Sequence, residues 1–233
     1  RTKVEQTLYV HQPLPFSSYK FNITENFKFW IYQNLIGKKI YKSIKKADKV
    51  IVQTNWMKEA CVEKTNIGTK KIKVIPPKVN LDINKTFKEK NNSKKIFFYP
   101  ASTSYYKNHR LIIKASKLLK EKKINNYKII FTIEKDENKH IKHLYAKVNK
   151  FNLPVKFVGK LKREDVFDLY KKSYLLFPSY IETFGLPMLE AKLHKTIILA
   201  SDKDFSHEIL DNYKNAYFFD PFDEKELMKL MKK

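Results

Sequence analysis

Short apolar runs alternate with stretches of helical periodicity along this 233-residue chain, and no other feature constrains the fold as strongly. The runs are rich in β-branched and aromatic residues. They predict strands at 7–11, 50–54, 72–75, 96–99, 129–133, 155–158, 174–177, 196–200 and 216–219. Continuously apolar strands that alternate with amphipathic helices are typical of parallel sheets covered on both faces. The sequence therefore predicts an α/β protein.

Helical periodicity is clearest at 26–46, 56–65, 109–122, 138–151, 163–172 and 186–194. After Pro76 and Pro77 the chain becomes polar, as is typical of a connector. We therefore expect an N-terminal domain over 1–78, a linker over 79–93 and a C-terminal domain over 94–233. The N-terminal part has about three strands, which is few for an independent sheet.

The formal net charge of +24 favours an anionic partner, such as nucleic acid, a phosphorylated substrate or an anionic lipid. Only Arg1, Arg110 and Arg163 are arginine. Lysine lacks the planar fork that reads bases, so the charge argues against nucleic acid. A composition biased towards Lys, Asn and Ile explains the charge equally well. A single cysteine, Cys61, and no apolar run long enough for a membrane span favour a cytoplasmic setting.

The segment 26–46 combines apolar residues, among them Phe27, Trp30 and Leu35, with six lysines. A basic amphipathic helix of this kind can lie on an anionic membrane surface. Its apolar face can equally pack on the N-terminal sheet, and both hold if only the lysines touch lipid.

The segment 177–191 predicts a strand, a loop and a helix, with Gly185 directly before the helix and Pro187 near its start. Backbone N–H groups at a helix N-terminus are unpaired and lie at the positive end of the dipole. A diphosphate can bind there, because Gly185 has no side chain to block its approach. We expect the amides of Phe184, Gly185 and Leu186 to hold it.

Two glutamates flank this junction. Glu190 falls roughly 4.5 Å along the helix axis from Pro187, where its carboxylate can accept hydrogen bonds from a ribose diol. Glu182 precedes the helix, where a transferred sugar would present its hydroxyls. On spacing alone, a surface loop with two solvated glutamates is an equal alternative.

The run 178–191 resembles the E-x7-E motif of glycosyltransferase family 4, with Glu182 and Glu190 as its carboxylates and Phe184-Gly185-Leu186-Pro187 between them. Segments after this motif are also similar to those of the family, and the resemblance covers nearly the whole chain after Leu8. It implies a GT-B fold, with two Rossmann-like domains of which the N-terminal one is partial. It also implies a nucleoside-diphosphate-sugar donor, retention of anomeric configuration, and no metal or other cofactor.

The resemblance extends to other donor contacts. Lys107 matches a family lysine that binds the diphosphate, whereas Ala101 and Ser102 stand where the family has a Gly-Arg pair. The arginine contact would be replaced by hydroxyls such as that of Ser102, by the backbone, or by nothing. The strand ending at Gly159 is similar to the one beside the nucleotide base.

His11 resembles a family histidine that faces the transferred sugar, although a lone histidine after a strand is more often structural. Metal binding is weakly signalled by Asp202 and Asp204, and by His140 and His143. We expect Asp204 to cap a helix instead.

The resemblance predicts a hexosyltransferase that transfers a sugar to a glycan or lipid-linked acceptor at the inner face of a bacterial membrane, for lipopolysaccharide or capsule. The alternatives are another GT-B enzyme, such as an epimerase or phosphorylase, and a non-enzymatic basic module binding membrane or nucleic acid. The sequence does not give the oligomeric state. The resemblance implies that parts of the family's enzymes are absent before His11 and after Lys233, so we expect this chain to bind donor without turnover. The alternative is a natural short form that completes its sheet through a partner chain.

Overall fold

The computed structural model describes residues 4–79, 86–88 and 94–233, which fold into two compact units. The first unit comprises Arg1–Val79 and the loop Ile181–Gly185. The second comprises Asn80–Tyr180 and Leu186–Lys233. Most of the expected linker, 79–93, lies outside the described residues, so the expected domain boundary stays a prediction.

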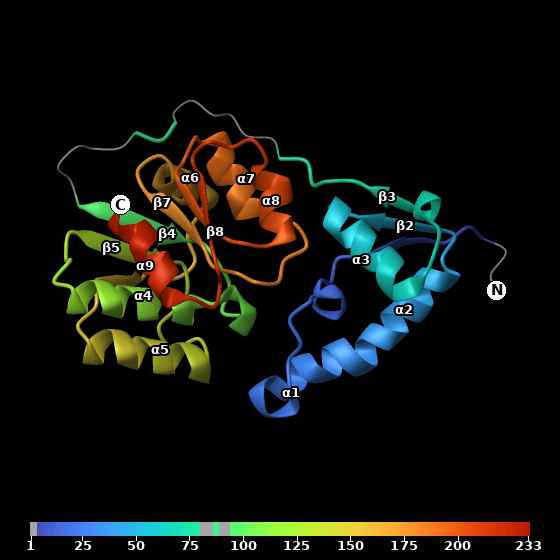
Figure 1. Ribbon diagram of the computed structural model, residues 1–233, viewed down its shortest axis with the longest axis horizontal. Coiled ribbons are helices and arrows are strands. Elements are labelled where there is room, and N and C mark those ends of the chain that lie inside the picture. Colours follow the sequence, from blue (N-terminus) through green and yellow to red (C-terminus); the bar gives the residue numbers. More distant parts are fainter. Residues whose placement is uncertain (1–3, 80–85, 89–93) are drawn as a thin grey trace. The chain divides into compact units, whose positions relative to one another are not determined.

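The first unit contains a three-stranded parallel sheet in the order β1 (Thr7–Tyr9), β2 (Lys49–Val52) and β3 (Ile72–Val74). Helices α2 (Gly37–Lys46) and α3 (Asn55–Thr65) cover one face (Figure 1). Their apolar side chains and those of the strands share a core that includes Ile44, Val50, Met57, Cys61 and Ile72.

The helix expected at 26–46 is continuous to Lys46 but irregular, with a kink at Asn26 (φ −158°, ψ 92°) and a π-helical turn further on. Helix α1 (Ile23–Ile31) begins earlier, because the Asn22 side chain accepts a hydrogen bond from the Glu25 amide at 2.6 Å. A π-helical turn, Tyr32–Ile36, then joins α1 to α2. The apolar face of α2 packs on the sheet, whereas α1 contains no buried residue. The alternative that the apolar face of this segment packs on the N-terminal sheet therefore holds for α2 and not for α1.

The second unit contains a six-stranded parallel sheet of β4 (Lys95–Tyr99), β5 (Tyr127–Phe131), β6 (Val155–Phe157), β7 (Tyr174–Phe177), β8 (Ile198–Ser201) and β9 (Ala216–Phe219). Its spatial order is β6-β5-β4-β7-β8-β9. The direction of strand addition reverses between β4 and β7. Ligands of such doubly wound sheets bind beyond the carboxyl ends of the strands at this reversal.

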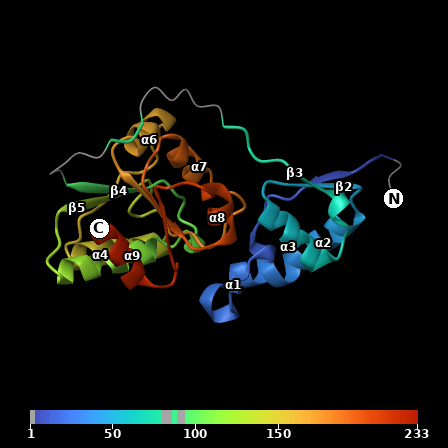
Figure 2. The same cartoon turned by 45° about the horizontal axis from the view of Figure 1, so that its top comes forward.

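Helices cover both faces of this sheet (Figures 1 and 2). One face carries α4 (His109–Glu121), α5 (Lys139–Lys150) and α9 (Glu224–Lys232), and the other carries α6 (Arg163–Tyr170), α7 (Leu186–Leu193) and α8 (Asp204–Leu210). The nine expected strands and the five helices expected after residue 55 are confirmed within a few residues, and so is the α/β class; α8 and α9 were not among the expected ranges.

Candidate functional site

The carboxyl edge of the six-stranded sheet gathers the expected donor-binding residues of the second unit. Ser102 and Lys107 follow β4, Gly159 follows β6, and Leu186 and Glu190 lie on α7, which follows β7. Because all six strands are parallel, these segments leave the sheet at one edge. The segments after β4 and β7, which carry four of these residues, flank the reversal point, whereas Gly159 after β6 lies at the same edge of the sheet two strands from β4.

Asn108 ties together three of the loops at this edge. Its side-chain amide donates to the Pro178 carbonyl at 3.3 Å and to the Pro221 carbonyl at 2.7 Å. Asn108 is 2% exposed and has a φ of 61°, a left-handed conformation that asparagine tolerates better than most residues. This residue was not expected from the sequence, although an asparagine directly before a helix is a recognisable terminus signal.

Further hydrogen bonds fix the loop after β4. The Tyr106 carbonyl accepts from the Ser179 hydroxyl and from the Tyr180 amide, both at 3.2 Å. The Tyr99 hydroxyl donates to the Lys107 carbonyl at 2.7 Å. The backbone at Lys107 is thereby held, while Ser102 is exposed at the edge of the loop. A fixed backbone limits the space that the Lys107 ammonium can reach.

The local geometry at position 159 requires a glycine. Its φ is 72°, and a Cβ added there would lie 2.0 Å from Oε1 of Glu134, which follows β5. Its amide donates to the Ile133 carbonyl at 3.3 Å. A glycine at this point lets the loops after β5 and β6 approach each other closely.

Glu190 is not a solvated surface glutamate, since its side chain is only 15% exposed. Its Oε1 lies 3.4 Å from Nη2 of Arg163, and its Oε2 accepts from the Tyr170 hydroxyl at 3.2 Å. Burial raises the pKa of Glu190 above its ordinary value, while the charge of Arg163 and the hydrogen bond from Tyr170 oppose that shift. The alternative of a solvated glutamate is therefore wrong for this position.

The remaining expected site residues belong to the first unit. The loop Ile181–Gly185 carries Glu182, the buried Phe184, and Gly185, whose φ is 89°. The carbonyl of Thr183 accepts from the Thr54 hydroxyl at 2.9 Å and from the Trp56 indole at 3.0 Å.

His11, which directly follows β1, is exposed and stacks on Tyr9, with ring centroids 5.9 Å apart. The expected site is thus divided between the two units.

The residues that weakly signalled a metal site make contacts of a different kind. Oδ1 of Asp202 lies 2.6 Å from Nε2 of His207. Asp204 is the first residue of α8 and Lys203 holds the cap position, so the expected capping by Asp204 is wrong. An acid in the first turn instead favours the helix dipole. Within the described ranges no three His, Cys, Asp or Glu residues group as metal ligands, and no helix is long and apolar enough to span a membrane.

The family follows from comparison with known proteins. Residues 82–233 match the model of the family "Glycosyl transferases group 1", and the chain belongs to that family.

Two curated relatives are bacterial. The chain is 28% identical over 231 residues to the O-antigen chain mannosyltransferase RfbU of Salmonella typhimurium, an alignment covering 97% of this chain and 60% of RfbU. It is 32% identical over 152 residues to the capsular polysaccharide biosynthesis glycosyltransferase CapH of Staphylococcus aureus, covering 63% of this chain and 39% of CapH. The chain therefore spans less than two thirds of either relative.

The fold matches that of HepE from Anabaena, solved in complex with UDP and glucose. The TM-score is 0.71 at 16% identity, and the match covers 97% of this chain and 60% of HepE. The expected GT-B fold is confirmed.

Proposed function

We propose that this chain forms most of a retaining glycosyltransferase that moves a sugar from a nucleoside-diphosphate sugar to a glycan or lipid-linked acceptor in bacterial surface polysaccharide biosynthesis. Family membership supports the reaction class. The relatives named for O-antigen and capsule support the pathway, and the UDP and glucose bound by HepE support the donor class.

One observation carries the proposal, namely a mostly buried carboxylate at the carboxyl edge of the doubly wound sheet. Glu190 would accept hydrogen bonds from the ribose, while Lys107 and the amides of Phe184, Gly185 and Leu186 would hold the diphosphate. Ser102 would supply a hydroxyl to the diphosphate, and Gly159 would lie beside the base. A family 4 enzyme of hexosyltransferase type fits these roles best.

The reaction proceeds on one face of the sugar. The acceptor oxygen bonds to the anomeric carbon as the bond to the diphosphate oxygen breaks, and that oxygen takes the acceptor proton. Glu182 orients the sugar and His11 contacts it. Negative charge that develops on the diphosphate is stabilised by donors already aimed at it, so the reaction needs no metal or cofactor.

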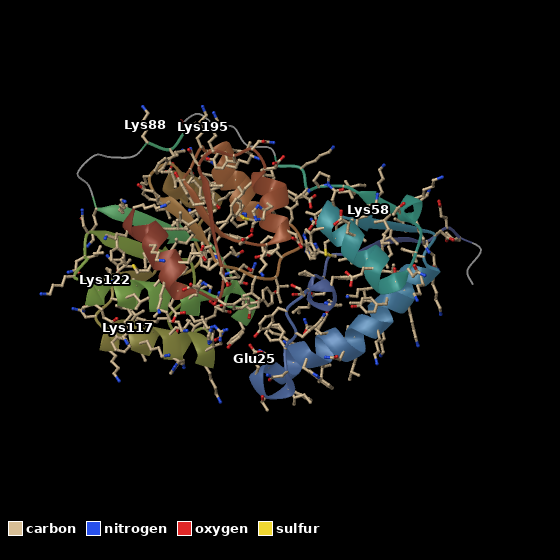
Figure 3. The ribbon with its side chains drawn as sticks, in the orientation of Figure 1. Glu25, Lys58, Lys88, Lys117, Lys122 and Lys195 are labelled. Carbon is tan, nitrogen blue, oxygen red and sulfur yellow. The ribbon has the colours of Figure 1, made fainter. Side chains whose placement is uncertain are left out.

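A nucleic-acid-binding module is less well supported. Lys58 on α3, and Lys117 and Lys122 at α4, project from helices of both units (Figure 3). These cations are lysines, and the chain has only three arginines, whose guanidinium fork is the basic group that reads bases. We place the enzyme at the inner face of the bacterial membrane instead, where lysines attract anionic lipid.

The two glutamates provide the test. Glu190→Gln should weaken nucleoside diphosphate binding by about tenfold to a hundredfold, since a hydrogen bond to a charged group is worth about 1.5–3 kcal/mol. Glu182→Gln should leave that affinity unchanged and lower the turnover of the full-length enzyme, because sugar orientation matters at the transition state. Isothermal calorimetry measures the first effect and sugar-transfer kinetics the second.

Glu164→Gln, which neutralises an exposed acid on α6, is the control and should change neither quantity. Equal nucleotide affinity in all three variants contradicts the site. An epimerised or phosphorolysed sugar, identified by NMR, would assign the chain to another GT-B activity. Salt-dependent DNA binding without any nucleotide-sugar effect would favour the basic module.

A further inference from the structure

Helix α6 holds the Glu190 carboxylate through both of its ends. Arg163 is the first residue of α6 and Tyr170 is the last. Arg163 contacts Oε1 and Tyr170 donates to Oε2, so each carboxylate oxygen has one protein partner. An ionised carboxylate offers about four acceptor positions. Each oxygen therefore keeps about one acceptor position for a ligand.

The Tyr170 hydroxyl has a fixed position. Its residue is completely buried, and its ring packs against Phe98 and His194, with centroids 5.7 Å and 5.6 Å away. Its carbonyl accepts from the Thr196 hydroxyl at 2.7 Å, which also anchors the end of α6. Tyr170 cannot turn away from Glu190 without disturbing the core.

Arg163 is held more loosely. Its side chain is 59% exposed, and its guanidinium carbon lies 5.1 Å from the centre of the Phe167 ring. An exposed ion pair contributes little to stability. A role in orienting Glu190 explains why this contact comes from one of only three arginines in a lysine-rich chain, because a guanidinium presents its donors in a fixed plane.

We propose that Arg163 and Tyr170 are positioning residues for Glu190, which leave one acceptor position on each carboxylate oxygen for the two vicinal hydroxyls of a nucleotide ribose. This inference rests on the proposed function. It adds that ribose binding depends on two side chains of α6 that need not touch the ligand.

Charge supports the same arrangement. Burial raises the pKa of Glu190, and a protonated carboxyl would present a donor where the diol needs acceptors. The charged and titratable groups that act on it are Arg163 and Tyr170 of α6 and His194, which directly follows α7, and all three lower its pKa. The Nδ1 atom of His194 lies 2.7 Å from the Glu190 carbonyl.

The first test needs no ligand. In protein labelled with ¹³C at the glutamate carboxyls, the Glu190 signal is assigned with Glu190→Gln and followed against pH. Tyr170→Phe and Arg163→Gln should each move the titration midpoint upward, while Arg163→Lys should restore part of the change. Lys162→Gln removes the same charge one residue earlier and should leave the midpoint in place. Unmoved midpoints in the Arg163 and Tyr170 variants would overturn the proposal.

The second test measures the affinity for UDP and for GDP across pH. Tyr170→Phe and Arg163→Gln should weaken binding by about threefold to tenfold, and more at acidic pH, where the carboxyl protonates. If the wild type binds either nucleotide and the variants bind it equally well, the positioning role is wrong while the proposed function stands. If the wild type binds neither nucleotide, the proposed function fails and the ribose role fails with it.

Discussion

The two units build parallel sheets by the same local pairing but bury them differently. In the second unit β5, β7 and β8 are almost wholly buried, since helices cover both faces. In the first unit β2 has buried residues only at alternate positions and β1 has none, and Tyr9 on β1 is 48% exposed. Parallel sheets usually have both faces covered. Among the described residues, only the sheet of the second unit has helices on both faces. The same unit carries Glu190, the residue proposed to bind the nucleotide.

This difference can be measured because both tryptophans, Trp30 and Trp56, belong to the first unit. Tryptophan fluorescence therefore reports the first unit, whereas far-ultraviolet circular dichroism reports both. The two stability experiments below alter the second unit and use the first as an internal reference.

The largest effect is expected from Phe98→Ala. Phe98 is completely buried in β4, at the centre of the six-stranded sheet. Its loss should lower the free energy of unfolding of the second unit by about 3–5 kcal/mol, through lost burial and a residual cavity. Urea unfolding followed by circular dichroism should shift while the fluorescence transition stays in place. A parallel shift of both signals would mean that the units unfold as one.

Tyr217→Ala on β9 is the matched control for Phe98. The Tyr217 side chain is 43% exposed, so its truncation should cost under about 1 kcal/mol.

The second prediction concerns His109, which is 1% exposed and packs between Tyr99 and Phe131. Burial, with smaller contributions from His140 and Lys107, lowers its pKa from 6.5 to about 3. The folded state therefore keeps it neutral while the unfolded chain takes up a proton below pH 6.5, and stability falls as the pH falls. At pH 5 the loss should be about 2 kcal/mol. His109→Phe, compared with wild type by urea unfolding at about pH 7 and pH 5, should abolish this part of the loss.

One outcome would contradict this prediction. If wild type and His109→Phe lose the same stability on acidification, His109 is protonated in the folded state and is not buried between the two rings. Tryptophan fluorescence should be insensitive to the change, because His109 lies in the second unit.

A smaller effect is expected from Lys107→Ala, which should weaken nucleoside diphosphate binding by about tenfold, or about 1.4 kcal/mol, and nucleoside monophosphate binding less. The reason is that no arginine stands at Ser102, which leaves Lys107 as the main side-chain cation proposed for the diphosphate. Calorimetry with both ligands checks this, with Lys122→Ala as the control. Equal losses for the two ligands would count against a diphosphate contact.

The smallest effect per residue is expected for binding of the first unit to an anionic membrane. On α1 and the following turn, Ile23, Phe27 and Leu35 are 54%, 59% and 53% exposed, and the lysines of α2 are exposed beside them in the chain. Each lysine near an anionic surface contributes about 1 kcal/mol. Co-sedimentation should show binding to phosphatidylserine-containing vesicles, released by high salt.

Matched charge reversals separate the two units in that experiment. Lys38→Glu with Lys42→Glu should abolish vesicle binding, whereas Lys122→Glu in the second unit should not. Equal binding to neutral and anionic vesicles would contradict the membrane proposal.

Much of this architecture could be predicted from the sequence because its signals are local. Strands buried on both faces need continuous apolar runs, so the predicted bounds of β4, β5 and β7 lie within two residues of those in the structure. Gly185 before α7, and the spacing from Glu182 to Glu190, are local patterns too. The kink at Asn26 and the π-helical turn between α1 and α2 were not predicted. Directly after that turn, the chain comes close to a proline from a distant segment. A Cβ at Gly37 would lie 3.0 Å from Cβ of Pro15.

Only the tertiary structure decided what surrounds the proposed site. Glu190 meets its partners 20 and 27 residues away, and Asn108 binds carbonyls 70 and 113 residues away. The grouping of Ile181–Gly185 with the first unit is equally invisible to local patterns. Periodicity records which face of an element is buried, and it therefore determined the strands and helices. It does not record which distant side chain fills the space beside a residue, and that neighbour sets the burial, orientation and charge of the carboxylate.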